Sequence, residues 1–383
     1  MGNVDELLDG AVSSGQVSGA VGIATVQGCP SYLGAFGLRA SASWGRMSGD
    51  TLFQADGLLR PVLAVAALQL VDSCVVGLDQ PLRTVIPGLA APRVLTGFTS
   101  EGTPLLRPAR GEITLRRVLS HTAGLADGSW WRASADLFTP HGTLPAGAPG
   151  LALLADPGTR WLHYSDVDLV RLVIERLSGM TVVEYLEDEI FRELGMVDTG
   201  FDSGQRSRPW GRPEAAGFGG FCTTPRDYLE FVEAVLFQDQ SVLSPESFAL
   251  LCTNQIGALT VPATVSLTQA RTPADLNFYP EIRLRSTMTG KWSLGFLVNL
   301  DGVPGGPEAG TLTCAGDANT YCWVDPAAGV AGLLFTQARP GRSEASEVLF
   351  ARFQRAVYAN RRTHREGDAD GTTDDWPSDT LPN

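Results

Sequence analysis

The sequence predicts an α+β fold, in which an antiparallel sheet is flanked by helices and carries an inserted helical lobe. Segments with the apolar pattern of strands lie near both ends of the 383-residue chain, and most helical spacing lies between them. Strands from both termini would therefore build one sheet. The cleft between the two lobes would be the default ligand site.

The first predicted elements are a helix, two strands and a buried helix. Residues Val4–Ser14 have helical spacing, whereas Gly19–Val26 and Ser31–Arg39 alternate or run apolar between Gly and Pro, as paired strands do. The largely apolar segment Leu58–Val75 predicts a buried helix, in whose first turn Pro61 is tolerated.

The middle of the chain is predicted to be mainly helical. A loop is expected over 79–89, followed by helices over Leu115–Ser120, Tyr164–Gly179, Thr181–Leu194 and Thr224–Phe237. Residues 126–160 are rich in Gly, Pro and Trp and lack periodicity. In a compact domain such a stretch is more typical of a binding loop or lid than of filler.

The C-terminal part is predicted to return to the sheet. Strands are expected over Leu294–Asn299, Thr311–Ala315, Thr320–Asp325 and Val330–Thr336, and a closing helix over Ser343–Asn360. The prediction is one domain over 1–360, with an α/β lobe from 1–75 and 285–360 and a mainly helical lobe from 76–284. Residues 361–383 are predicted to form a disordered acidic tail.

Composition excludes several classes of partner. The formal net charge of −13 disfavours nucleic acid and anionic membrane surfaces, and no apolar stretch approaches the roughly 20 residues that span a bilayer. No secretory signal is visible at the N-terminus, so a cytoplasmic location is expected. The expected partner is a small-molecule substrate, and nothing indicates the oligomeric state.

The cysteines are predicted to be reduced thiols in the core. The chain has six, at Cys29, Cys74, Cys222, Cys252, Cys314 and Cys322. They are scattered, with no CxxC pair and no His at ligand spacing, which argues against a zinc site and a disulfide framework. Neither a metal nor a cofactor is predicted.

A series of motifs along the chain resembles one hydrolase family. In order they read LFQADGLLRPVLAVAALQLVDSCVVGLDQPL, ITLRRVLSHTAGL, DPGTRWLHYSDVDLVRLVIERLSG, IFRELGMVDTGF, GGFCTTPRDYLEFV and TLTCAGDANTYCWVDPAAGVAGLLFTQ. Over Val4–Asn360 the chain is similar to serine β-lactamase-like hydrolases: class C β-lactamases, penicillin-binding proteins and EstB-type esterases. The resemblance implies a β-lactamase/transpeptidase-like fold.

The same resemblance implies that the catalytic pair of the family is replaced. The nucleophilic Ser position holds Gly57, and the Lys base position holds Arg60. Glycine has no side chain to acylate, and arginine stays protonated. An acyl-enzyme needs a nucleophile within reach of a base, so turnover through this serine position is not expected. Lys291, the only lysine, is predicted to be a surface residue rather than a substitute base.

Other motif positions supply candidate catalytic groups. The family's second-motif Tyr corresponds to Tyr164, and Asp166 stands in place of its Asn partner. Tyr164 is the predicted acid or base, with a pKa lowered by Arg60; the alternative is a packed remnant. Arg60 either stabilises negative charge or pairs with Asp56. Asp166 and Asp317, which lies at the oxyanion edge, are candidate assisting carboxylates, although Asp166 also fits family variation.

A second group of residues is predicted to contact substrate. Its members are Gly57, Asp56, His121, Trp130, Trp131, Cys314 and Gly316. Cys314 and Gly316 begin and end the third motif, which has lost its polar or aromatic first residue. His121, in HTAGL, has the alternative role of a structural loop anchor. Trp130, Trp131 and Trp161 either wall an apolar pocket or pack in the core.

The leading hypothesis is a repurposed enzyme without the Ser–Lys machinery. It would catalyse a non-hydrolytic step, such as cyclisation, isomerisation or addition–elimination, on a small and largely apolar molecule, in a setting such as specialised-metabolite biosynthesis. One alternative is a non-catalytic ligand-binding pseudo-hydrolase. Another is a hydrolase that uses water activated by Asp166 or Asp317.

Overall fold

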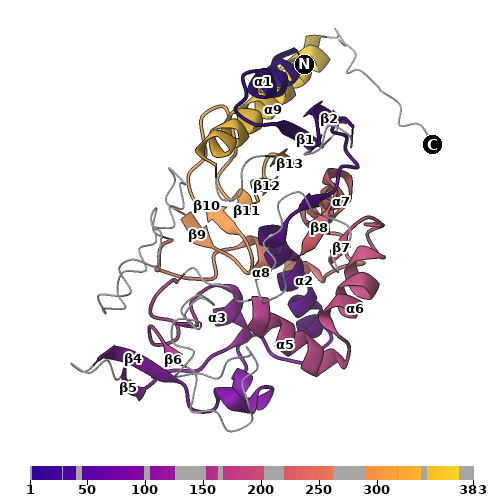
Figure 1. Cartoon of the computed structure of the whole chain (residues 1–383). Helices are drawn as coiled ribbons and strands as arrows, with labels where there is room; N and C mark the ends of the chain where they lie inside the picture. Colours follow the sequence, from indigo (N-terminus) through magenta and orange to yellow (C-terminus); the bar gives the residue numbers. More distant parts are fainter. Residues whose placement is uncertain are drawn as a thin grey trace. The chain divides into compact units, whose positions relative to one another are not determined.

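The structure, a computed structural model, divides into two compact units. It describes residues 2–27, 29–39, 45–98, 104–125, 152–162, 167–201, 220–261, 290–316, 318–337 and 343–370. The first unit comprises 1–60, 187–242 and 301–383, and the second comprises 61–186 and 243–300. Figure 1 labels the elements along the chain.

An antiparallel sheet built from both ends of the chain organises the first unit. Its strands are β1 (Gly19–Val26), β2 (Cys29–Gly37), β11 (Leu312–Ala315), β12 (Thr320–Asp325) and β13 (Val330–Gln337), in the order β2-β1-β13-β12-β11. β1 and β13 pair along their full lengths, from Gly19 opposite Gln337 to Val26 opposite Val330. The predicted joining of the termini in one sheet is therefore confirmed.

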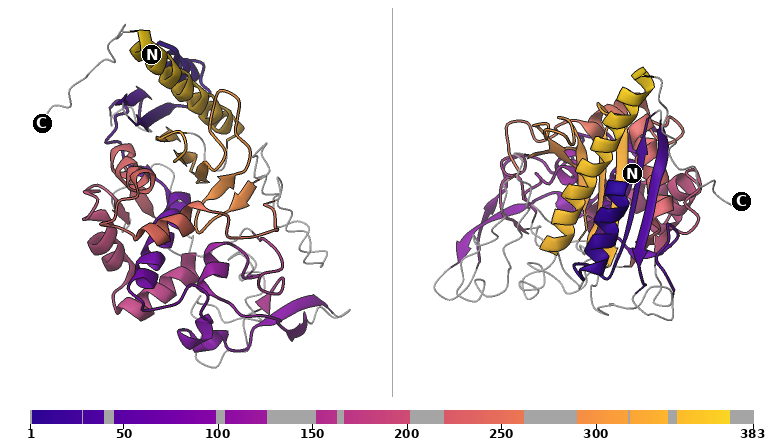
Figure 2. Two further views of the ribbon diagram at one scale, coloured as in Figure 1. Left: turned by 180° about the vertical axis from the view of Figure 1, so that it is seen from behind. Right: turned by 90° about the horizontal axis from the view of Figure 1, so that it is seen from above.

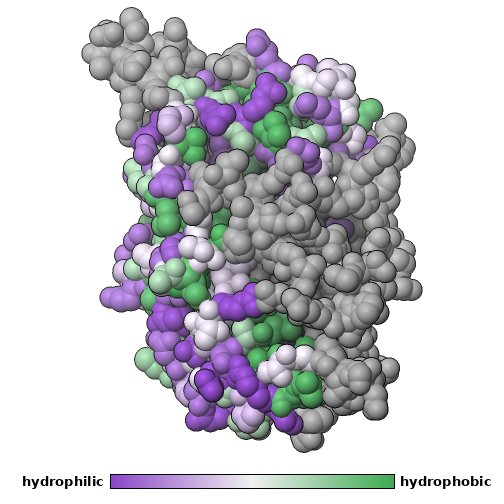
Figure 3. All heavy atoms as spheres, turned by 90° about the vertical axis from the view of Figure 1, so that its left-hand side faces the viewer, coloured by the Kyte–Doolittle hydropathy of each residue, from purple (hydrophilic) through white to green (hydrophobic). Residues whose placement is uncertain are grey.

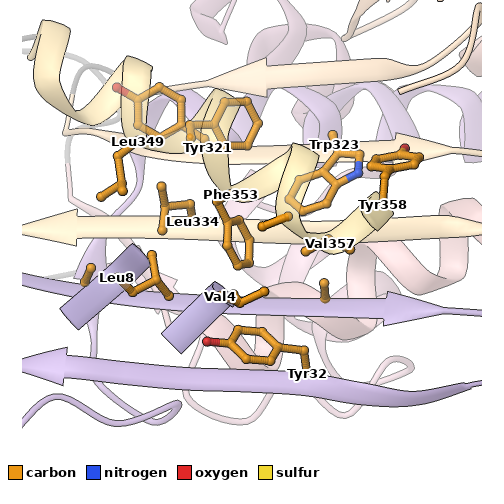
Figure 4. Packing of buried hydrophobic residues seen from close by; sticks show 14 of the residues in the cluster. Val4, Leu8, Tyr32, Tyr321, Trp323, Leu334, Leu349, Phe353, Val357 and Tyr358 are labelled. Carbon is orange, nitrogen blue, oxygen red and sulfur yellow. The ribbon is translucent and has the colours of Figure 1, made fainter. Parts of the chain in front are cut away.

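Two terminal helices cover one face of this sheet. They are α1 (Gly2–Ser13) and α9 (Glu344–Asp370), which lie side by side in both views of Figure 2. Figure 4 shows the core that they bury, with Val4, Leu8, Tyr32, Tyr321, Trp323, Leu334, Leu349, Phe353, Val357 and Tyr358 labelled. The apolar spacing of α1 explains its position, because helical residues four apart share one face.

The opposite face of the sheet carries α7 (Pro225–Phe237). The Thr224 hydroxyl caps this helix by accepting a hydrogen bond from Asp227 N at 3.1 Å. Tyr228 and Phe231 are buried, and the helix packs against β1, β12 and β13. Residues 187–242 therefore belong to the first unit, and their predicted place in a helical lobe over 76–284 is corrected.

A small sheet leads into the turn that carries Gly57 and the helix that carries Arg60. Its strands are β3 (Phe53–Gln54), β8 (Phe221–Thr223) and β7 (Gly200–Phe201), in the order β3-β8-β7. The chain then forms a 3₁₀ turn, η2 (Asp56–Leu58), and continues as α2 (Leu59–Asp72). The buried helix predicted over Leu58–Val75 is thus present, and it starts one residue later than predicted.

The second unit combines short helices with two small strand groups. The helices are α3 (Leu115–Leu119), α5 (Val167–Ser178), α6 (Val182–Leu186) and α8 (Pro245–Cys252), with 3₁₀ turns η3 (Leu82–Thr84) and η4 (Pro87–Leu89). Strands β4 (Arg93–Phe98), β5 (Pro104–Pro108) and β6 (Ala152–Leu153) form one sheet. Strands β9 (Gly290–Trp292) and β10 (Leu297–Asn299) form a hairpin.

Several elements differ from the sequence prediction. The helix predicted over Thr181–Leu194 is α6 followed by a π-helical turn, η5 (Glu187–Phe191). The closing helix continues to Asp370, beyond the predicted end at Asn360. The β4–β5 hairpin was not predicted, because Gly97 and flanking prolines interrupt its apolar alternation.

The surface is mixed in character. Large apolar side chains such as Leu38, Leu105, Val197 and Phe237 are exposed, and they come from different elements. On the face drawn in Figure 3, hydrophilic and smaller hydrophobic areas alternate over the coloured residues. Among the described helices, none combines the length and the apolar character needed to cross a bilayer.

Candidate active site

The backbone at Gly57 is fixed by a tight turn at the start of α2. Leu58 N donates to Ala55 O at 2.7 Å, and Ala55 N donates to Phe221 O on β8 at 2.8 Å. Leu58 and Leu59 are buried, whereas Arg60 is only partly buried in the first turn of α2. Apolar residues thus anchor the turn and leave Gly57 against the neighbouring strand.

Gly57 lies in direct backbone contact with Gly316, which follows β11. An ideal Cβ on Gly57 would lie 2.3 Å from Gly316 Cα and 3.0 Å from Ala315 O. A Cβ on Gly316 would in turn lie 2.7 Å from Thr320 Oγ1. These separations are far inside van der Waals contact, so a side chain at position 57 has no room unless the backbone moves.

The Asp56 carboxylate ties this turn to β8. Its Oδ1 accepts hydrogen bonds from Gly220 N at 3.1 Å and Phe221 N at 3.0 Å, and its Oδ2 accepts one from Gln54 Nε2 at 2.6 Å. A carboxylate that accepts several N–H donors is held in one orientation. These bonds give Asp56 a positioning role for the turn that carries Gly57.

Beneath Gly57 lies a layer of thiols and one phenol. Cys314 Sγ is 3.4 Å from Gly57 O, and Tyr228 Oη donates to Leu58 O at 2.7 Å. Cys322 lies directly opposite Cys314 on the neighbouring strand. Complete burial, reinforced by the two thiols, raises the pKa of the Tyr228 hydroxyl well above its usual value. Tyr228 therefore acts here as a neutral donor.

Sequence reasoning missed Tyr228 and Cys322 as neighbours of position 57. Cys322 lies directly opposite Cys314 across the β11–β12 ladder. The alternation of β12 was a usable signal, because Thr320 and Cys322 share one face while Tyr321 and Trp323 face α9. Tyr228 lies in the motif GGFCTTPRDYLEFV, but nothing in that motif indicates its contact with Leu58.

Within the second unit, His121 lies in an aromatic cluster. Its ring centroid is 5.7 Å from that of Trp161 and 4.8 Å from that of Trp292, both close to edge-to-face. His121 is 1% exposed, has a φ of 58° and accepts a hydrogen bond from Leu162 N at 2.9 Å. His121 is thus buried, has a left-handed backbone conformation and holds a neighbouring segment, which agrees with its alternative role as a structural loop anchor.

Lys291 is engaged in holding a loop of the same unit. Its Nζ donates to Gly257 O at 2.9 Å and also to Leu259 O. Both acceptors are backbone carbonyls, so the Lys291 ammonium group is engaged in structural hydrogen bonds. The lysine therefore acts as a clamp for the loop between α8 and β9.

Five predicted site residues lie outside the described part of the chain. They are Tyr164, Asp166, Asp317, Trp130 and Trp131. Their roles remain predictions from the motifs. Across the residues that are described, no group of three His, Cys, Asp or Glu side chains is arranged to hold a metal ion.

Comparison with known proteins identifies the family. The family model described as Beta-lactamase matches residues 4–356. The chain belongs to the beta-lactamase family. The resemblance drawn from the six motifs is therefore confirmed, and so is the predicted fold class, since solved structures of the same fold cover nearly the whole chain.

Relatives of this beta-lactamase-family chain include acyltransferases and an esterase. Monacolin J acid methylbutanoyltransferase of Aspergillus terreus is 26% identical over 91% of this chain and 93% of its own length. Lovastatin esterase of Penicillium rubens is 26% identical over 84% of this chain and 89% of its own. The first protein is named for the transfer of a methylbutanoyl group and the second as an esterase.

Two solved structures extend the comparison. Unliganded simvastatin synthase (LovD) from Aspergillus terreus has a TM-score of 0.76 and 25% identity, and covers 94% of this chain and 98% of its own. EstCE1, described as a hydrolase with promiscuous acyltransferase activity, has a TM-score of 0.67 at 20% identity, covers 93% and 97% of the two chains, and shares the fold. The family scaffold therefore surrounds a position 57 without a side chain.

Proposed function

We propose that this beta-lactamase-family chain is an enzyme that works without an acyl-enzyme at position 57. It would catalyse a non-hydrolytic step, such as cyclisation, isomerisation or addition–elimination, on a small and largely apolar molecule. The observation that carries the proposal is the backbone contact between Gly57 and Gly316, where an added Cβ would lie 2.3 Å from Gly316 Cα.

The contact matters because acyl transfer needs both a nucleophile and a base. Position 57 offers no hydroxyl, Arg60 keeps its proton, and Lys291 is held by two carbonyls. A general acid or base and a fixed positive charge are enough for proton-transfer chemistry at carbon or oxygen. The proposed step therefore needs only groups that the motifs retain.

In this proposal the roles follow the motif positions. Tyr164 moves a proton to or from the substrate, and Arg60 with nearby backbone N–H groups stabilises developing negative charge. Asp317 or Asp166 assists. The relatives named for methylbutanoyl transfer and for a lovastatin ester support a substrate that is small and largely apolar. A biosynthetic setting for a specialised metabolite belongs to the same proposal.

A second candidate function is a non-catalytic binding protein. The observation that favours it is also at Gly57, because the close packing removes the nucleophile position without introducing another side chain there. This candidate predicts that a ligand is bound and released unchanged. The two functions therefore differ in the chemical state of the molecule after incubation.

Mass spectrometry of incubated small molecules separates these functions. A set of lipophilic acids, esters and polyketide-like compounds is incubated with the wild-type protein, with Tyr164→Phe and with Tyr32→Phe as the matched control. Tyr32 Oη donates to Asp5, in α1, so its loss leaves the proposed site untouched. The proposal expects an isomeric or eliminated product with the wild type and Tyr32→Phe only.

Three other outcomes are informative. Equal product from Tyr164→Phe would overturn the proposed mechanism. Binding with no product supports the second candidate function. Product that incorporates oxygen from labelled water would instead indicate hydrolysis by carboxylate-activated water.

A further inference from the structure

The two strand thiols beneath Gly57 form a pair across an antiparallel ladder. Cys314 on β11 lies directly opposite Cys322 on β12, and residues directly opposite point to the same face. Both thiols are reduced in the structure, with Cys314 5% exposed and Cys322 fully buried. Among the described residues of these two strands, Cys314 and Cys322 are the cysteines that face each other across the ladder.

The register of this pair places its Cα atoms within the range of a disulfide. Gly316 N donates to Thr320 O at 2.8 Å, two residues along the same ladder, so Cys314 and Cys322 also occupy a hydrogen-bonded pair of positions. In such pairs the Cα atoms are about 5.5 Å apart, and disulfides span Cα separations of about 4.4–6.8 Å. The Cβ atoms of facing residues, about 4.5–5.5 Å apart, must approach to the roughly 3.5–4.5 Å of a disulfide, so the two strands close slightly when the bond forms.

The pair is also connected to position 57. Cys314 Sγ donates to Gly57 O at 3.4 Å. Tyr228 Oη donates to Leu58 O, the next carbonyl of the same turn, at 2.7 Å. A change at the thiols thus reaches the turn at the start of α2 directly.

We infer that Cys314 and Cys322 are a redox-active dithiol site that a hydroperoxide converts to an intramolecular disulfide. Two S–H bonds break and one S–S bond forms, while the two hydrogens and two electrons reduce one hydrogen peroxide molecule to two waters. Oxidation removes the S–H that faces Gly57 O. The site lies outside the proposed catalytic groups and does not depend on them.

The sequence offers a direct assay for this bond. Cleavage before aspartate separates fragments 301–316 and 317–324, each of which holds one cysteine of the pair. Full-length protein is treated with hydrogen peroxide, alkylated, digested and examined by mass spectrometry, with a dithiothreitol-treated sample beside it. The inference expects the two fragments joined after oxidation and separate after reduction.

The controls use the same chain. Cys74→Ala removes an exposed thiol and should leave the joined fragments unchanged, whereas Cys322→Ala should abolish them. If Cys322→Ala fails to fold, the comparison of oxidised and reduced wild-type protein is sufficient to test the inference. Separate, alkylated fragments in oxidised wild-type protein would overturn the inference, and so would sulfinic acid at Cys314 with Cys322 still reduced.

Discussion

At the scale of single residues, the contact between Gly57 and Gly316 limits what this chain can do at position 57, which the motifs predict to be the family's nucleophile position. The limit is steric, because Gly316 Cα occupies the place of a Cβ on residue 57. Gly316 cannot easily move away, because Thr320 Oγ1 lies close to it on the neighbouring strand. The packing around position 57 therefore agrees with the predicted loss of the serine.

Restoring serine at position 57 should cost stability. We expect Gly57→Ser to lower the free energy of unfolding by about 1–3 kcal/mol, as overpacking of a close-packed site usually does. The matched control is Gly10→Ser, where an added Cβ meets nothing within 4 Å. Urea unfolding measures both variants. A Gly57→Ser protein as stable as Gly10→Ser would contradict the close packing.

Tyr228 offers a second residue-scale test. Tyr228→Phe would leave Leu58 O without its donor in a fully buried position, which costs about 1–3 kcal/mol. Tyr32→Phe is the control, because its partner Asp5 is exposed and water can replace the lost donor. Equal unfolding midpoints for the two variants would show that the bond to Leu58 contributes little.

At the scale of elements, the lysine clamp makes a specific prediction about the loop between α8 and β9. Lys291→Met removes both bonds to Gly257 and Leu259. We expect faster hydrogen exchange at Leu259 N and Val261 N, whose acceptors are Ile256 O and Gly290 O. Lys291→Arg, which keeps several donors, should restore slow exchange. Unchanged exchange in Lys291→Met would refute the clamp.

Elements with a clear apolar pattern were predictable from the sequence. β1, β12 and α7 lie within a residue of their predicted bounds, because the two strands are short segments buried throughout and α7 repeats its apolar residues at helical spacing. The β4–β5 hairpin and α8 were missed, since Gly97 and prolines obscure the first and α8 has only eight residues. The place of residues 187–242 was also missed, because chain order does not reveal which sheet face a helix covers.

The candidate site, like the fold, could be predicted only in part from the sequence. Motif order identified Gly57, Gly316 and Cys314 as neighbours, and the structure brings these three together. Asp56 is held by β8 backbone groups, a contact that depends on a strand 165 residues away. Tyr228 and Cys322 depend on packing between distant segments, which a single sequence does not display.

At the scale of the whole molecule, the thiol of Cys252 should make stability depend on pH in alkaline solution. Burial raises the pKa of Cys252 from 9.0 to about 12. Above pH 9 the unfolded thiol loses its proton first, so the unfolded state binds fewer protons than the folded state. The free energy of unfolding should therefore fall as pH rises from about 9 to 12. Cys252→Ala should make this fall shallower; an identical slope in urea titrations would contradict the assignment.

The central claim for the molecule is that it works without an acyl-enzyme, and one measurement tests it most directly. A Cys74→Ala protein, which lacks an exposed thiol, is mixed with p-nitrophenyl butyrate and sampled rapidly for intact mass and released nitrophenolate. The account predicts an unchanged protein mass and no stoichiometric burst. A butyryl adduct mapped to Tyr164, Cys314 or the segment 52–60, formed with a burst, would contradict it.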